Sequence, residues 1–122
     1  MLYSALIYET PGVADARPSE QREKVLEAHR QLQKDSKAAG SFVAATQLSE
    51  AGAITIRHRK DETLLTDGPF AETKELFIGF YLFDVASLDE AIKLAKRIPM
   101  SETGSVEVRP VVFAESDGIP PQ

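Results

Sequence analysis

Apolar residues recur along the chain with two different periods, and these periods predict its secondary structure. Residues 2–8 are rich in aromatic and branched side chains and are apolar on both faces, which is typical of a central buried strand. Residues 76–85 are almost continuously apolar and predict the strongest strand of the chain. Residues 41–48 and 106–113 predict two further strands.

Residues 19–39 take the helical period instead. Ser19 is the expected N-cap, and Gly40 supplies the left-handed residue that ends the helix. The preceding residues, 10–18, contain two prolines and a glycine and are expected to form a loop. The predicted stripe that faces the core consists of Val25, Ala28, Leu32, Ser36 and Ala39.

Residues 87–98 predict a second helix. Ser87 and Glu90 have the spacing of a capping box, and Pro99 ends the segment because proline disfavours a helical conformation in the residue before it. The predicted apolar stripe consists of Leu88, Ile92, Ala95 and Ile98.

A hairpin is predicted between the second strand and the strongest strand. Residues 53–59 alternate between apolar and polar side chains, and residues 60–62 form a polar turn. Residues 63–66 would return the chain alongside the first arm of the hairpin. The hairpin is an insertion in an otherwise regular order of elements.

Without the hairpin, the order is strand, helix, strand, strand, helix, strand. This βαββαβ order predicts an α+β, ferredoxin-like fold in residues 1–113, followed by a C-terminal tail in residues 114–122. Right-handed crossovers place both helices on one face of the sheet, so the other face lacks a cover. A homodimer that encloses a small cavity would supply that cover.

The closing strand predicts which side chains lie on each face. Val106 and Val108 are expected to face the helices, whereas Glu107 and Arg109 are expected to point to the uncovered face. Arg109 could pair with Glu107 as a ladder neighbour, or it could bind an anionic substrate, because its planar fork matches a carboxylate.

Composition narrows the possible functions. The chain has 122 residues, which suits one domain, and its net charge of -5 argues against nucleic acid as the main ligand. It contains no cysteine, so disulfides and thiolate metal sites are impossible. The chain begins without the basic region of a signal peptide, and no apolar run reaches membrane-spanning length. We therefore expect a soluble, cytoplasmic protein.

Residues 66–75, between the hairpin and the strongest strand, include residue types that are typical of a turn. Gly68 precedes Pro69 and is expected to be extended, and Asp67 could close an Asx-turn onto nearby amides. Phe70 could pack beneath such a turn as an apolar plug. A functional interpretation instead requires three ionisable side chains to converge on a pocket, namely Asp67, Glu72 and Lys74.

Residues 67–75, Asp-Gly-Pro-Phe-Ala-Glu-Thr-Lys-Glu, resemble the signature of the DGPF branch of the YCII-related proteins. The resemblance extends over about residues 1–112 and includes Ile7-Tyr8, residues 79–82 and residues 104–111. It implies a dimeric α/β-barrel in which two ferredoxin-like sheets face each other. This agrees with the uncovered face that the order of elements predicts.

The resemblance also implies an acid–base site. A histidine on the first helix, paired with an aspartate, is the proposed site of the wider YCII group, and His29 is the histidine that matches. The matching aspartate would precede Pro99, where this chain has Ile98. Asp67 could take its place only if the signature loop approaches His29. The alternative to a catalytic role is a structural one, in which His29 is partly buried and hydrogen-bonded to a backbone carbonyl.

Metal and cofactor chemistry have little support in the sequence. His58 lies between two arginines in the hairpin and is expected to be solvated. The two histidines lack metal-ligand spacing, and no phosphate-binding glycine loop or nucleophile elbow occurs. The apolar residues 76–83 indicate core and not a cofactor site.

Three hypotheses of function follow. The first is an acid–base enzyme of the isomerase or lyase type, without cofactor, acting on a small organic molecule in a dimer cavity. Its catalytic residues would be His29 and Asp67. The substrate would be bound by Glu72, Lys74 and Arg109. The resemblance supports this through muconolactone-isomerase-like and dehydrochlorinase-like relatives of the fold. The second is a ligand-sensing or accessory regulatory protein whose partner is an extracytoplasmic-function sigma factor. The third is a dimer without chemistry, in which the signature loop is only a turn.

Overall fold

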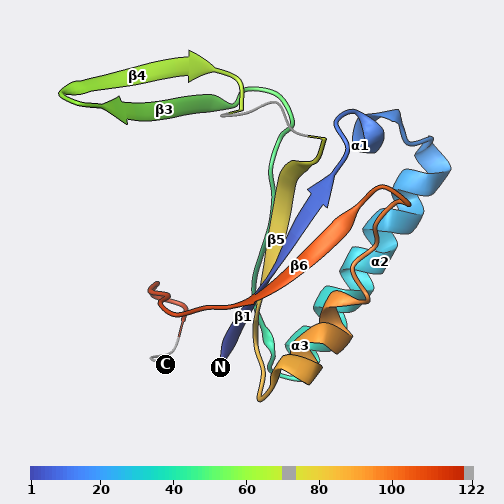
Figure 1. Ribbon diagram of the computed structural model, residues 1–122. Coiled ribbons are helices and arrows are strands. Elements are labelled where there is room, and N and C mark those ends of the chain that lie inside the picture. Colours follow the sequence, from blue (N-terminus) through green and yellow to red (C-terminus); the bar gives the residue numbers. More distant parts are fainter. Residues whose placement is uncertain (70–73, 120–122) are drawn as a thin grey trace.

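The structure is a computed structural model that describes residues 1–69 and 74–119, and it consists of a sheet, a layer of helices and a separate hairpin (Figure 1). The four-stranded antiparallel sheet has the order β2-β5-β1-β6. Its strands are β1 (Leu2–Glu9), β2 (Phe42–Gln47), β5 (Leu76–Asp84) and β6 (Ser105–Pro110). The helices are α1 (Val13–Ala16), α2 (Ser19–Ala38) and α3 (Leu88–Ala95). This confirms the predicted α+β, ferredoxin-like fold.

The core lies between the sheet and the two long helices, which cover the same face (Figure 1). Tyr3, Ala5 and Ile7 of β1 and Tyr81 and Phe83 of β5 point into it, because successive side chains of a strand alternate between faces. Leu32 of α2 is fully buried there, and Ala91 of α3 is 1% exposed. The buried cluster comprises Tyr3, Ala5, Ile7, Leu32, Tyr81, Phe83, Val85, Ala91, Ala95 and Ile98.

Helix α2 begins at Ser19, one residue earlier than a cap at that position would place its start. Ser19 is its first residue, and Pro18 occupies the N-cap position without a side-chain hydrogen bond. The expectation that Ser19 caps the helix is therefore wrong, because the fixed φ of proline, -59° here, already suits a helix entry. At the other end, Gly40 adopts φ 75° and donates to the carbonyl of Lys37, as predicted for the helix stop.

The loop expected before this helix contains the short helix α1, which the proline and glycine content did not predict. Gly12 begins it with φ 84°, and Ala16 donates to the Gly12 carbonyl at 3.0 Å. Helix α3 is capped as expected, since the Ser87 side chain accepts from the Glu90 amide at 3.3 Å. The Glu90 carboxylate accepts a hydrogen bond from the amide of Ala86, one residue before the cap.

The opposite face of the sheet carries no helix and is called here the open face (Figure 1). Val106 and Val108 pack against the core, whereas Glu107 and Arg109 are exposed, as the alternation in this strand predicts. Phe77 stacks on Phe80 with ring centroids 6.4 Å apart. The open face therefore combines apolar surface with two charged side chains.

Strand β6 is shorter than expected and ends at Pro110. It pairs with β1, which begins at Leu2, and beyond the hydrogen bond from Val111 to the Leu2 carbonyl no strand within residues 1–69 and 74–119 pairs with it. Val112 and Phe113, which we expected within the strand, are consequently exposed.

Strands β3 (Ile54–Arg59) and β4 (Glu62–Asp67) form the expected hairpin, a two-stranded arm that projects away from the sheet (Figure 1). The Gly68 amide donates to the Ala53 carbonyl at 2.7 Å and so continues the pairing beyond β4. Gly68 adopts φ 98°, a conformation that suits glycine, and not the ordinary extended conformation that we expected before Pro69. The Phe70 plug lies outside the described residues.

Candidate active site

A cavity of about 280 Å³ lies between α2 and the helix-covered face of the sheet. Such a volume suits a small organic molecule. Apolar side chains of helix, strand and loop form much of its wall, including Val25, Leu26, Ile78, Pro99 and Met100. Its polar lining includes Glu9, Arg17, His29, Gln33 and Tyr81.

His29 and Tyr81 form the closest polar pair in this cavity. His29 Nδ1 lies 2.6 Å from the Tyr81 hydroxyl, and the two rings stack with their centroids 5.8 Å apart. Gln33 lies one helical turn after His29 and donates from Nε2 to the same hydroxyl at 3.3 Å. Tyr81 is only 2% exposed, so its hydroxyl depends on these partners for its hydrogen bonds.

Burial changes the acidity of both members of the pair. It lowers the pKa of His29, and the positive charge of Arg17 lowers that pKa further. Burial raises the pKa of Tyr81, and the hydrogen bond from Gln33 offsets part of that rise. At neutral pH, His29 is therefore uncharged and Tyr81 keeps its proton.

The tautomer of His29 sets the direction of this hydrogen bond, because Nδ1 either donates its proton to the Tyr81 oxygen or accepts the proton of the Tyr81 hydroxyl. His29 Nε2 makes no hydrogen bond within residues 1–69 and 74–119. When Nδ1 donates its proton to the Tyr81 oxygen, Nε2 has a free lone pair and can accept a proton from a bound molecule. When Nδ1 instead accepts from the Tyr81 hydroxyl, Nε2 carries the proton and can donate it. The pair has the chemistry of a general acid–base group.

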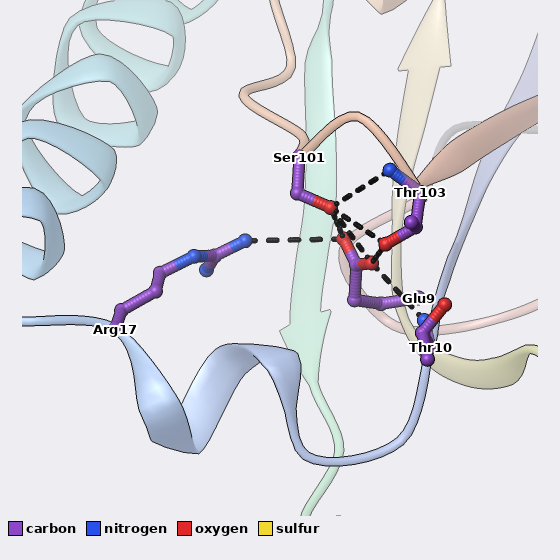
Figure 2. A network of polar contacts seen from close by, with 5 residues as sticks. All are labelled: Glu9, Thr10, Arg17, Ser101 and Thr103. Carbon is purple, nitrogen blue, oxygen red and sulfur yellow. Dashed lines mark hydrogen bonds and ion pairs between the residues drawn. The ribbon is translucent and has the colours of Figure 1, made fainter.

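Glu9 ends β1 beside the cavity and is 1% exposed (Figure 2). Its carboxylate accepts hydrogen bonds from the hydroxyls of Ser101, at 2.8 and 2.9 Å, and Thr103, at 2.7 Å. It also accepts from the Thr10 amide at 3.0 Å. Burial alone would raise the pKa of Glu9, but these bonds outweigh burial and lower it. A buried negative charge is therefore fixed next to the cavity.

Arg17 supplies the opposite charge. Its Nη2 atom lies 3.9 Å from Glu9 Oε2, and its side chain is 17% exposed (Figure 2). Arg17 is the C-cap of α1 and precedes Pro18, which accounts for its extended backbone at φ -63° and ψ 132°. Its carbonyl accepts from Arg22 Nε at 2.9 Å, which anchors this junction between α1 and α2.

The residues expected to form the site are not gathered around His29 in the described chain. Asp67 ends β4 and lines a different, open hollow of about 310 Å³ with Glu50 and Gly68. Arg109 is exposed on the strand β6, and Lys74 is exposed before β5. Glu72 lies outside the described residues. The roles expected for these side chains stay predictions.

Sequence analysis missed four polar residues of the cavity. Tyr81 and Glu9 continue the core-facing positions of β5 and β1, so a polar group on an apolar face was the available signal. Gln33 follows His29 by four residues and could have been placed beside it. Arg17 lies in the segment expected to be a loop, and nothing in its sequence context points to the cavity.

Two further features concern the described part of the chain. It contains no group of three or more His, Asp or Glu side chains placed to hold a metal ion. No helix in it has the length and apolar character needed to cross a membrane.

Comparison with known proteins gives two matches. A family model described as the YCII-related domain matches residues 1–114. An uncharacterised protein of Rhizobium meliloti (strain 1021) is 40% identical over 123 residues, which cover 98% of this chain and 99% of that protein.

Proposed function

The chain belongs to the YCII-related family, and from this premise we propose that it is an acid–base enzyme with His29 as its proton-transfer group. The proposed reaction is an isomerisation or an elimination on a small organic molecule, and it needs no cofactor. The observation that carries the proposal is the 2.6 Å bond between His29 Nδ1 and the Tyr81 hydroxyl inside the cavity.

A neutral histidine whose Nδ1–H donates to the tyrosine oxygen has a free lone pair on Nε2 and can take a proton there. The lowered pKa of His29 supports this role, because the uncharged ring is then present at neutral pH. In an isomerisation, His29 would remove a proton from carbon and return it at another carbon of the same molecule. In an elimination, the electron pair of the broken C–H bond would expel the leaving group, and His29 would release the proton to water.

The sequence led us to expect the reaction in a cavity between two open faces, with Asp67 as the partner of His29. The proposal now rests on the cavity between α2 and the sheet, with Tyr81 as that partner. Asp67 could contribute only from outside this cavity, since it lines the other hollow. Membership of the DGPF branch and a cytoplasmic location remain part of the proposal.

The test is a substrate panel of small unsaturated lactones and chlorinated phenols, followed by proton NMR in D₂O. For any compound that the wild-type chain converts, His29→Gln should lower kcat/KM by about 100-fold or more, as expected for loss of a general base. Tyr81→Phe should cause a smaller loss because the ring stays in place. Arg30→Gln, on the exposed part of α2, is the matched control. Undiminished conversion by His29→Gln would overturn the proposal.

The regulatory hypothesis gives a different result in the same experiment. A ligand sensor would bind a compound in the His29 cavity without converting it or exchanging its protons for deuterium. Such binding without turnover across the panel would favour a sensing role, with a sigma factor as the partner to seek.

We also propose that the chain forms a homodimer. Three separate apolar surfaces support this: the open face, the exposed side chains of Val112 and Phe113, and the arm, where Ile56 and Leu65 are 60% and 70% exposed. Surface of this extent is typical of an interaction site. Sedimentation velocity on the whole chain should give a dimer mass. A monomer at all concentrations up to about 100 μM, the range of Kd for weak association, would contradict the proposal.

A further inference from the structure

Arg17 has hydrogen-bonding capacity that the described protein does not use. Its guanidinium group carries five N–H donors, and its closest charged neighbour is Glu9 Oε2 at 3.9 Å, beyond hydrogen-bond distance. Within residues 1–69 and 74–119 this guanidinium makes no hydrogen bond. The side chain is nevertheless mostly buried, at 17% exposure, and it lines the cavity.

Glu9 does not need Arg17 to satisfy its carboxylate. Two hydroxyls and one amide already donate to Glu9, from Ser101, Thr103 and Thr10. Glu9 therefore attracts the guanidinium through its charge and leaves the donors of Arg17 unoccupied (Figure 2). A buried fork of this kind is complementary to a planar anion.

The surroundings of Arg17 favour a carboxylate over a phosphate. The negative charge of Glu9 opposes a dianion, and Arg17 is the only lysine or arginine among the described residues that line the cavity. The apolar wall contains Val25, Leu26 and Ile78, which suits a hydrocarbon body attached to the anionic group.

We propose that Arg17 binds the carboxylate of a small organic acid whose apolar body fills the cavity beside His29. The binding site follows from the geometry alone, and its assignment to a substrate rests on the proposed acid–base function. Arg17, and not Arg109 of the open face, is then the residue that selects an anionic substrate.

Binding at Arg17 also changes the environment of His29. The other charged or titratable side chains that line the cavity are Glu9, Arg17 and Tyr81. The charge of Arg17 lowers the pKa of His29, so an anion bound to Arg17 should cancel that effect and raise the pKa of His29. This gives a readout that does not require turnover.

The test uses benzoate as the probe and benzamide as its neutral counterpart, with binding followed by NMR of the histidine ring. Benzoate should bind the wild-type chain and raise the pKa of His29, whereas benzamide should bind at least about 10-fold more weakly. Arg17→Gln should weaken benzoate binding by about 10- to 100-fold, the effect of one charged hydrogen-bonding partner, and abolish the pKa change. Arg17→Lys keeps the charge and should restore part of the binding.

Arg109→Gln and Arg30→Gln are the matched controls and should leave benzoate binding unchanged. Equal binding of benzoate and benzamide, or a loss caused by Arg109→Gln in place of Arg17→Gln, would overturn the inference. His29→Gln separates the two proposals. If His29→Gln abolishes turnover while Arg17→Gln changes neither binding nor turnover, only the inference about Arg17 fails. If benzoate binding requires Arg17 but no compound is converted, only the enzyme proposal fails.

Discussion

The carboxylate of Glu9 lies at the end of β1, where burial by itself would raise its pKa. Hydrogen bonds from Thr103, Ser101 and Thr10 reverse that effect, because they stabilise only the ionised form strongly. The pKa of Glu9 in the folded chain is therefore below its value in the unfolded chain. Its contribution to stability is complete above the ordinary glutamate pKa of about 4.3 and is lost as the pH falls through the folded value.

Replacing Glu9 with glutamine should therefore destabilise the chain in a pH-dependent way. At pH 7 we expect the free energy of unfolding to fall by about 2 to 4 kcal/mol, because the charge-assisted hydrogen bonds become weaker and the amide group brings unsatisfied donors. The difference from wild type should shrink below about pH 4.3, where the wild-type carboxylate also becomes protonated. Urea unfolding at pH 7, 5, 4 and 3 measures both effects.

Glu27→Gln is the control for this experiment. Glu27 is exposed on α2 and faces Arg30 at 3.8 Å, so its replacement should change stability by about 0.5 kcal/mol or less. A loss for Glu9→Gln that is the same at every pH would show that the charge of Glu9 contributes nothing to folding.

At the scale of elements, strands β2 and β5 approach closely at Gly79. The residue pairs with Gln47 of β2 and with Ile7 of β1, next to an irregularity in the register. A Cβ atom at Gly79 would collide with the backbone carbonyl oxygen of Thr46. The close approach of these strands therefore depends on the absence of a side chain.

Gly79→Ala should destabilise the chain by about 1 to 3 kcal/mol, since the backbone of β2 would have to move away. Thermal unfolding followed by circular dichroism measures the loss. Gly118→Ala is a suitable control, because its Cβ would meet only the Ser116 hydroxyl oxygen at 4.0 Å. Equal unfolding temperatures for the two variants would contradict the close approach.

Elements with a strong local signal were predicted from the sequence. The Ser87 cap of α3, the Gly40 stop of α2 and the hairpin turn all depend on neighbouring residues, and the structure confirms them. Other features depend on distant residues. Strand β6 ends where β1 begins, and no local property of Val112 could have shown that its partner strand is absent.

The candidate site was only partly predictable for the same reason. His29 stood out as a titratable residue beside an apolar helical stripe, whereas Tyr81 differed from the phenylalanines of its strand only by a hydroxyl group. Arg17 lies at the cavity beside Glu9, a residue of another element, and only the tertiary structure brings these two side chains together. The spacing of Arg17, His29 and Tyr81 along the chain does not indicate that they line one cavity.

At the scale of the whole molecule, the arm formed by β3 and β4 has little to stabilise it within one copy. A two-stranded hairpin is marginally stable in water unless one of its faces is packed. Ile56 and Leu65 are directly opposed in the register and lie on the same face of the arm, where they are exposed. The proposed homodimer would bury this face.

Ile56→Lys and Leu65→Lys should each weaken self-association by about 10-fold or more, since either change removes about 1.5 to 3 kcal/mol of apolar burial from the interface. Sedimentation velocity over a concentration series measures the effect, and circular dichroism shows whether the sheet and helices persist. Thr66→Lys is the matched control, because Thr66 lies opposite Thr55 on the other face of the arm and the change in charge is the same. If Thr66→Lys dissociates the dimer as strongly as Leu65→Lys, added charge and not the apolar face of the arm would explain the effect. If all three variants remain dimeric, the open face together with Val112 and Phe113 must form the interface without the arm.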